Sequence, residues 1–210
     1  MGVNMAGNCI CDDEACREAS KPEIIRRYFD ALNALAKGST SEKEAQKIEL
    51  LMNMAGITVT DRKVVIKALE RAKETDGPAA ALELRDGRII TGKTTNLLGA
   101  SAALLLNVLK VLAGIDHETH IISPESIEPI QKLKVDYLKS KNPRLHTDEV
   151  LIALSASAAT NPQARLALSQ LPELAGCQAH TSVMLSDVDI KIFKKLEVQL
   201  TSEAVYEHAL

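Results

Sequence analysis

Apolar residues recur at every third or fourth position in the first part of the chain, the spacing that lines one face of a helix. This pattern predicts three helices, over residues 20–38, 41–56 and 60–76. Ser20 and Ser41 each stand three residues before a glutamate, the pattern of a capping box at a helix start. A glycine follows each apolar stripe and is expected to end the helix. The short connections indicate a small antiparallel helical unit.

Between residues 79 and 93, two short apolar runs flank the pair Asp86-Gly87, which is typical of a β-hairpin. Residues 97–115 follow as a long segment rich in alanine and leucine, with apolar positions at helical spacing. Its polar Asn107 and Lys110 fit a core helix, whereas a membrane span needs a longer uninterrupted apolar run. Hairpin and helix together indicate the centre of an α/β fold.

Strand and helix signals alternate in the remainder of the chain. The expected strands cover residues 119–123, 179–185 and 197–201, and the expected helices cover residues 124–139, 147–159, 161–171 and 186–196. Thr147, Asn161 and Ser186 stand where the last three helices begin and are expected to cap them. The expected fold class is α/β (α+β): a helical subdomain over residues 1–78, then a three-layer α/β sandwich with a mixed sheet over residues 79–210.

The order hairpin, helix, strand, helix is similar in layout to the cytidine-deaminase-like sandwich, a likeness of fold alone. Zinc deaminases carry His-x-Glu followed by Pro-Cys-x-x-Cys. Here the helix after the hairpin begins Gly99-Ala-Ser-Ala-Ala103, and the chain contains no Pro-Cys-x-x-Cys. Zinc-dependent deamination is therefore not expected.

Residues 87–94 formally match the phosphate-loop pattern G-x-x-x-x-G-K-[ST]. The residues between the two glycines include Ile89, Ile90 and Thr91, which are β-branched and favour an extended backbone. Gly87 suits the positive-φ position of the hairpin turn. We interpret the segment as hairpin and strand. A residual role remains for Lys93, Thr94, Thr95 and Asn96, as ligands of a phosphate at the start of the following helix.

The composition excludes several classes of protein. Of the 210 residues, 46% are hydrophobic and 2% aromatic, so the core must be aliphatic. The net charge is −3 and the basic residues are scattered, which argues against a nucleic-acid partner. The N-terminal residues lack the basic and apolar regions of a signal peptide, and no segment predicts a membrane span. We expect a cytoplasmic protein with reduced thiols.

Cysteine and histidine clusters were weighed as metal sites. Cys9, Cys11 and Cys16 lie close together, with Cys177 as a distant fourth thiol, but their spacing lacks the paired knuckle of zinc sites. His117 and His120 stand between a glycine and an expected strand, where no helix would align them. We expect no metal, and no cofactor is indicated.

The loop over residues 141–149 concentrates polar groups just before an expected helix. Its members with a candidate role are Lys141, Asn142, Arg144, His146 and Asp148. Cationic side chains beside helix N–H groups suit an anionic ligand, and His146 is the candidate catalytic residue because its side chain can move a proton at neutral pH. Asn161, at the next helix start, would complete the pocket. The alternative is a capped loop with surface charges, and the sequence favours neither.

Several blocks carry a family resemblance. They are residues 1–8 (MGVNMAGN), 86–93 (DGRIITGK), 127–133 (IEPIQKL), 140–150 (SKNPRLHTDEV) and 159–162 (ATNP). Together they resemble the C-terminal half of an uncharacterised bacterial family catalogued as domain of unknown function 1846. The resemblance implies members about twice this length, an additional N-terminal α/β half with its own glycine-rich loop, and a helical subdomain before the C-terminal α/β part. Some members are labelled ATP-dependent peptidases.

Two hypotheses of function follow. The first is half of a binding site for a phosphate- or carboxylate-bearing small molecule, completed by the N-terminal half of the family architecture. The second is a non-catalytic interaction or assembly module, for example in a homo-oligomer. A peptidase finds no support, because H-E-x-x-H, G-x-S-x-G and an ordered Cys–His pair are absent. Whether the chain is an enzyme stays open.

Overall fold

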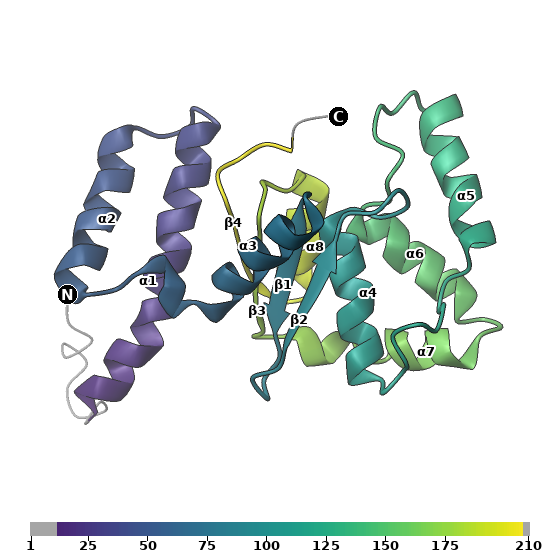
Figure 1. Ribbon diagram of the computed structural model, residues 1–210, viewed down its shortest axis with the longest axis horizontal. Helices are drawn as coiled ribbons and strands as arrows, with labels where there is room; N and C mark the ends of the chain where they lie inside the picture. The colour runs from purple at the N-terminus through teal and green to yellow at the C-terminus, as the bar shows by residue number, and fades with distance from the viewer. Residues whose placement is uncertain (1–11, 208–210) are drawn as a thin grey trace. The chain divides into compact units, whose positions relative to one another are not determined.

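The computed structural model describes residues 12–207 and divides the chain into two compact units, with the boundary between Arg62 and Lys63 (Figure 1). The first unit consists of α1 (Asp13–Ala36), α2 (Glu42–Ala55) and the short helix η2 (Val59–Asp61). α1 and α2 pack along each other, and Ile25, Phe29 and Met52 are buried.

α1 begins earlier than the sequence pattern predicted. The Asp12 carboxylate accepts a hydrogen bond from the Ala15 N–H at 2.9 Å and caps the helix. Ser20 lies inside the helix, and its hydroxyl donates to the Cys16 carbonyl instead. The capping-box pattern at Ser20 was therefore misleading, because an equally good cap precedes it and good helix formers lie between.

The second unit is built on a four-stranded mixed sheet of order β2-β1-β3-β4. The strands are β1 (Ala79–Glu83), β2 (Ile89–Lys93), β3 (Gln178–Thr181) and β4 (Gln199–Ser202). β1 is antiparallel to both β2 and β3, whereas β3 and β4 are parallel. The predicted hairpin is confirmed: Gly87 has a φ of 83°, and the Leu84 N–H donates to the Arg88 carbonyl at 2.8 Å.

Helices lie on both faces of this sheet. The helices of this unit are α3 (Lys63–Thr75), α4 (Ala100–Leu112), α5 (Pro124–Lys132), the π-helix η3 (Leu133–Tyr137), α6 (Thr147–Ser157), α7 (Pro162–Leu168), the 3₁₀-helix η4 (Leu171–Leu174) and α8 (Asp187–Lys195). Of these, α3, α4 and α8 contact the strands of the sheet. Ala80 and Leu82 of β1 join the large core that includes α4, whereas Ala81 packs on the other face against Val64 and Ala68 of α3. The three-layer arrangement of helix, sheet and helix is therefore confirmed.

Gly92 explains why the false phosphate-loop pattern contains a glycine. A β-carbon at this position would lie 2.2 Å from the backbone nitrogen of Leu104 in α4. Only glycine permits so close an approach between β2 and α4. The segment is hairpin and strand, as interpreted, and the glycine serves helix–strand packing.

Two expectations about the architecture were wrong. α3 packs on β1, β2 and β3, so it belongs to the sheet unit, and the boundary expected at residue 78 lies after Arg62. No strand forms at residues 119–123 in the described part of the chain. Ile121 and Ile122 are buried in the core around α4 without pairing to the sheet, so the order of a cytidine-deaminase-like layout is not reproduced. Within residues 12–207, no helix combines the length and hydrophobicity that crossing a membrane requires.

Candidate functional site

Three helices of the second unit begin at one cavity of about 210 Å³. Its lining includes Gly99, Ala100 and Ser101 at the start of α4, His146 before α6, Ser186 and Asp189 at the start of α8, and Thr94, Asn142, Arg144 and Glu207 around them. A helix N-terminus carries partial positive charge and unpaired backbone N–H groups. What satisfies those groups at each helix decides what the cavity can bind.

The start of α6 is satisfied from within the protein. Asp189 of α8 is buried, and its Oδ1 accepts hydrogen bonds from the Thr147 N–H at 2.9 Å and the Thr147 hydroxyl at 2.8 Å. Glu149 accepts from the His146 N–H at 2.8 Å. Thr147 was expected to be the cap of this helix, but it is the first helical residue and is itself a donor to Asp189.

Asp189 also holds the His146 ring. The Nδ1 atom of His146 lies 2.9 Å from Asp189 Oδ2, and the Ser186 hydroxyl donates to the same oxygen at 2.7 Å. Burial alone would raise the pKa of Asp189, but the hydrogen bonds from His146, Thr147 and Ser186 lower it to about 2. The hydrogen bond to Asp189 raises the pKa of His146 above its ordinary value, against the opposing effect of burial.

This geometry defines the His146 tautomer. Because Asp189 is ionised at neutral pH, Nδ1 carries the proton of the ring, and Nε2 of the neutral ring has a lone pair. Nε2 has no hydrogen-bond partner among the residues that the structure describes. The His146 side chain is 32% exposed. The ring is therefore held by Asp189 at Nδ1, while Nε2 can accept a hydrogen bond or a proton.

The start of α4 differs, because no side chain caps it. Gly99 is the N-cap residue, and the first intrahelical bond runs from the Ala103 N–H to the Gly99 carbonyl at 2.9 Å. Ser101, in the first turn, is only 3% exposed, yet its hydroxyl has no hydrogen-bond partner within the described chain. The Thr94 hydroxyl oxygen, which also lines the cavity, is fully buried and has no hydrogen-bond partner in the described residues. Donors at this end of the cavity are thus left for a ligand.

The loop before α6 is held by its own polar groups. The buried Lys134, in η3, donates to the Arg144 carbonyl at 2.6 Å and to Glu149 at 2.8 Å. The Asn142 side chain accepts from the Arg144 N–H at 3.1 Å. The Arg144 guanidinium forms an ion pair with Glu207 at 2.6 Å. Much of the polarity that the sequence suggested for a ligand therefore shapes the loop.

The cavity contains part of the predicted site. Asn142, Arg144 and His146 line it, whereas Lys93, Asn96, Lys141 and Asp148 do not. Asn161 caps α7, accepting from the Gln163 N–H at 2.9 Å, and lines a different cavity.

The sequence analysis did not identify Ser101 and Asp189 as members of the site. Each lies in a sequence pattern that we interpreted in another way. Ser101 stood in the block compared with the deaminase motif, at the start of the predicted core helix. Asp189 was seen as the third position of a capping box begun by Ser186, which the structure confirms through the Asp189 N–H donating to the Ser186 hydroxyl.

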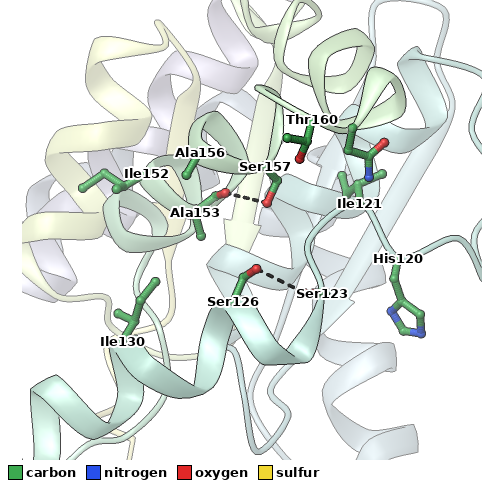
Figure 2. Close-up of a pocket in the computed structure, with 11 residues that line it drawn as sticks. His120, Ile121, Ser123, Ser126, Ile130, Ile152, Ala153, Ala156, Ser157 and Thr160 are labelled. Carbon is green, nitrogen blue, oxygen red and sulfur yellow. Dashed lines mark hydrogen bonds between the residues drawn. The ribbon is translucent and has the colours of Figure 1, made fainter.

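A second, larger cavity of about 440 Å³ lies between α5 and α6 (Figure 2). Hydroxyl groups line it, but three of them already form hydrogen bonds within the protein. Ser157 donates to the Ala153 carbonyl at 2.9 Å, and the hydroxyl oxygens of Ser123 and Ser126 are 3.1 Å apart and hydrogen-bonded to each other. His120 is its one ionisable lining residue. This cavity therefore offers weaker recognition than the first.

The prediction that the cysteines bind no metal concerns Cys9, Cys11, Cys16 and Cys177. Of these, Cys9 and Cys11 lie outside the described residues. In residues 12–207, no group of three potential ligands gathers around a common point, and Cys16 and Cys177 are free thiols. Burial raises the pKa of the Cys177 thiol.

Comparisons with known proteins place the chain among proteins of unknown function. Residues 60–210 match the family model "Domain of unknown function DUF1846, C-terminal", and residues 1–56 match the corresponding N-terminal model. A UPF0371 protein of Corynebacterium aurimucosum is 59% identical over 98% of this chain and 41% of its own length. One from Streptococcus thermophilus is 49% identical over 99% of this chain and 42% of its own.

These matches correct the expected resemblance to a C-terminal half alone. The helical unit matches the N-terminal family model, and the change of model between residues 56 and 60 falls near the unit boundary at Arg62. The chain spans about two fifths of the length of these relatives.

Proposed function

The chain belongs to the DUF1846 family, and on that premise we propose that its sheet unit binds a small anionic molecule in the cavity where α4, α6 and α8 begin. The observation that carries this proposal is the uncapped start of α4. Among the described residues, no side chain caps its first-turn backbone N–H groups and no group hydrogen-bonds the Ser101 hydroxyl, and this helix start lines a cavity that also contains Arg144 and His146. Helix N-termini with these features favour phosphate or carboxylate groups.

The charges around the cavity support one anionic group. Hydrogen bonds keep Asp189 ionised, and its negative charge is offset by His146 when that ring is protonated, a form that the raised pKa of His146 favours. Arg144 supplies a permanent positive charge and a planar set of donors. These groups match a single phosphate or carboxylate better than an extended polyanion.

Glu207 binds Arg144 in the way that we expect for the carboxylate of a ligand. Its carboxylate lies 2.6 Å from the Arg144 guanidinium, which is only 27% exposed. A carboxylate on a ligand would make the same contact and must displace Glu207 to do so. The Glu207 side chain is 38% exposed, so the competing ion pair is a weak one.

The size of the cavity limits the ligand. A volume of about 210 Å³ is smaller than the roughly 300–1,000 Å³ of sites for drug-sized molecules. A metabolite of a few carbon atoms with one anionic group fits that volume. In the relatives, which are more than twice as long, additional residues would complete the site.

Titration of the purified chain with inorganic phosphate, followed by calorimetry, tests the proposal. Arg144→Ala should weaken binding at least about tenfold, because a hydrogen bond to a charged group contributes roughly 1.5 kcal/mol. Lys141→Ala is the matched control, since Lys141 is exposed and lies outside the cavity lining. Glu207→Gln should strengthen binding by roughly two- to fivefold. Equal affinities for the wild type and Arg144→Ala would refute the proposal.

A second candidate function is an interaction module. α2 exposes Leu50, Leu51 and Met54, with Met54 79% exposed, which forms an apolar stripe on one side of that helix. A module that assembles through this stripe would gain thermal stability with protein concentration in the absence of any ligand. Leu50→Glu should abolish that dependence and leave phosphate binding unchanged.

A further inference from the structure

We propose that the same cavity is a hydrolytic site, with Ser101 as nucleophile, His146 as general base and Asp189 as the residue that positions His146. This inference rests on the proposed anion site and adds a reaction to it. The three residues come from the first turns of α4 and α8 and from the residue before α6, and all line the cavity of about 210 Å³. Their pattern of burial and hydrogen bonding differs from that of residues engaged only in capping.

Ser101 is the first part of the evidence. Ser101 is 97% buried. The hydroxyl of a buried serine normally donates a hydrogen bond to a nearby carbonyl, as that of Ser157 does to Ala153. Ser101 has no such partner within residues 12–207. Its neighbours Ala100 and Ala102 are buried as well, and Ala100 lines the same cavity. The hydroxyl is therefore oriented by a rigid helix and chemically unoccupied.

The His146–Asp189 pair is the second part. A histidine acts as a base toward a hydroxyl when one ring nitrogen is held by a carboxylate and the other has a lone pair. Asp189 meets this requirement with four hydrogen bonds that fix its own orientation, two from Thr147 and one each from His146 and Ser186. Ser101 and His146 are not hydrogen-bonded to each other here. Such contacts often tighten only when substrate binds.

The start of α4 supplies the third part, a site for negative charge. When the Ser101 hydroxyl adds to a carbonyl carbon, the carbonyl oxygen becomes an oxyanion. The unpaired N–H groups in the first turn of α4 are positioned to donate to that oxygen, as in other oxyanion holes. Arg144 then holds the anionic group elsewhere on the substrate.

The reaction balances without any cofactor. Ser101 Oγ attacks the carbonyl carbon of an ester while its proton passes to His146 Nε2. The ester C–O bond breaks, and the leaving alkoxide takes the proton from His146 and departs as an alcohol. Water then attacks the acyl-serine, losing a proton to His146, which returns it to Ser101 as the free acid leaves.

The substrate class follows from the charges and the volume. A phosphoryl transition state spreads charge over three oxygens and normally requires several cations. This cavity offers one oxyanion site and one guanidinium, which suits a small carboxylic ester that bears one anionic group. A polypeptide substrate does not fit a cavity of about 210 Å³.

Diisopropyl fluorophosphate tests the nucleophile directly, because it phosphorylates an activated serine with loss of fluoride. Intact mass spectrometry of the whole chain should show one adduct, and peptide mapping should place it on Ser101. Ser101→Ala should remove the adduct. His146→Ala should slow its formation at least about a hundredfold, as expected for loss of a general base. The control His120→Ala, in the other cavity, should react like the wild type.

The positioning role of Asp189 has its own readout. In the wild type, the labelling rate should rise with pH as His146 loses its proton, with a midpoint above 6.5. Asp189→Asn should slow labelling at least about tenfold and move this midpoint downward. An unchanged midpoint would contradict the positioning role.

The outcomes separate this inference from the proposed binding function. Ser101→Ala should still bind inorganic phosphate, more weakly by up to about tenfold, because one hydroxyl donor is lost while Arg144 and the backbone N–H groups remain. If phosphate binds but no adduct forms on Ser101, the hydrolytic site is wrong and the anion site stands. An adduct on another serine, retained in Ser101→Ala, would also overturn it.

Discussion

α4 and α6 begin at the same cavity, and they satisfy their N-termini in opposite ways. At α6, Asp189 accepts from the Thr147 N–H and hydroxyl, and Glu149 accepts from the His146 N–H. At α4, Gly99 precedes the helix and no side chain caps it. The protein thus uses its own carboxylates at one helix, and the proposed anion would serve the other.

The difference teaches how to separate structure from function in a polar cluster. The cationic and polar residues before α6 indicated an anion-binding loop in the sequence, yet several of their hydrogen bonds and ion pairs hold the loop itself. The start of α4 contains only glycine, alanine and serine and looks unremarkable in the sequence. In residues 12–207, the absence of an internal partner, rather than the presence of charge, is the basis on which we propose the start of α4 as the binding side of the cavity.

The largest expected effect comes from removing the carboxylate that serves α6. Asp189→Asn should lower the free energy of unfolding by about 3 kcal/mol, because the buried charge that accepts from Thr147, Ser186 and His146 is lost. Urea denaturation at pH 6 measures this. The exposed Asp187, in the same turn of α8, provides the matched variant Asp187→Asn, which should cost at most about 1 kcal/mol. Equal losses for both variants would show that Asp189 is an ordinary first-turn acid.

Acid should erase the same contribution in the wild type. The pKa of Asp189 falls from 3.8 to about 2 on folding, so its ionised form contributes roughly 2 kcal/mol at pH values above 4. This contribution is lost as pH falls through 2. The stability difference between the wild type and Asp189→Asn, measured in urea, should therefore shrink between pH 5 and pH 2. A constant difference over this range would contradict the assignment of the low pKa to Asp189.

The contribution of His146 to the free energy of unfolding has the opposite pH dependence and is lost as pH rises. The pKa of His146 is raised on folding, so the attraction between its charged ring and Asp189 is complete below pH 6.5. It is lost as pH rises through the higher pKa of the folded state. Stability should accordingly decline gently above neutrality, and His146→Gln should remove that slope.

The fold could be predicted where local signals dominate. The hairpin around Gly87 and the cap of α8 at Ser186 both follow from short-range chemistry, and both were correct. The strand expected at Ile121 and Ile122 was wrong. A buried apolar segment becomes a strand only if a free sheet edge lies beside it, and the position of that edge depends on the packing of the whole sheet. α3 was assigned to the wrong unit for a similar reason, since its apolar face does not reveal its partner.

The candidate site was predictable only in part. Arg144 and His146 were identified because charge beside a helix start is visible in the sequence. Asp189 lies 43 residues from His146 and is brought to it by the packing of α8 on α6. Ser101 is distinguished by its place in the cavity lining and by the lack of a hydrogen-bond partner among residues 12–207, which no sequence pattern encodes. Long-range packing therefore decided which of the predicted polar residues share a cavity.

The central claim is that the uncapped start of α4 binds an anion, and Gly99 offers the most direct test. Its φ of −69° and ψ of 161° suit any residue, and an added β-carbon would lie 3.8 Å from its nearest neighbour, the Leu145 carbonyl oxygen. Gly99→Asp would cap α4 from within, as Asp189 caps α6. Gly99→Ala adds the carbon without the carboxylate.

Calorimetric titration with inorganic phosphate should therefore give Gly99→Ala an affinity within about twofold of the wild type. Gly99→Asp should bind at least about tenfold more weakly, a loss of roughly 1.4 kcal/mol, while its thermal stability is retained or increased. If a stably folded Gly99→Asp binds phosphate as tightly as Gly99→Ala does, the start of α4 is not the anion site.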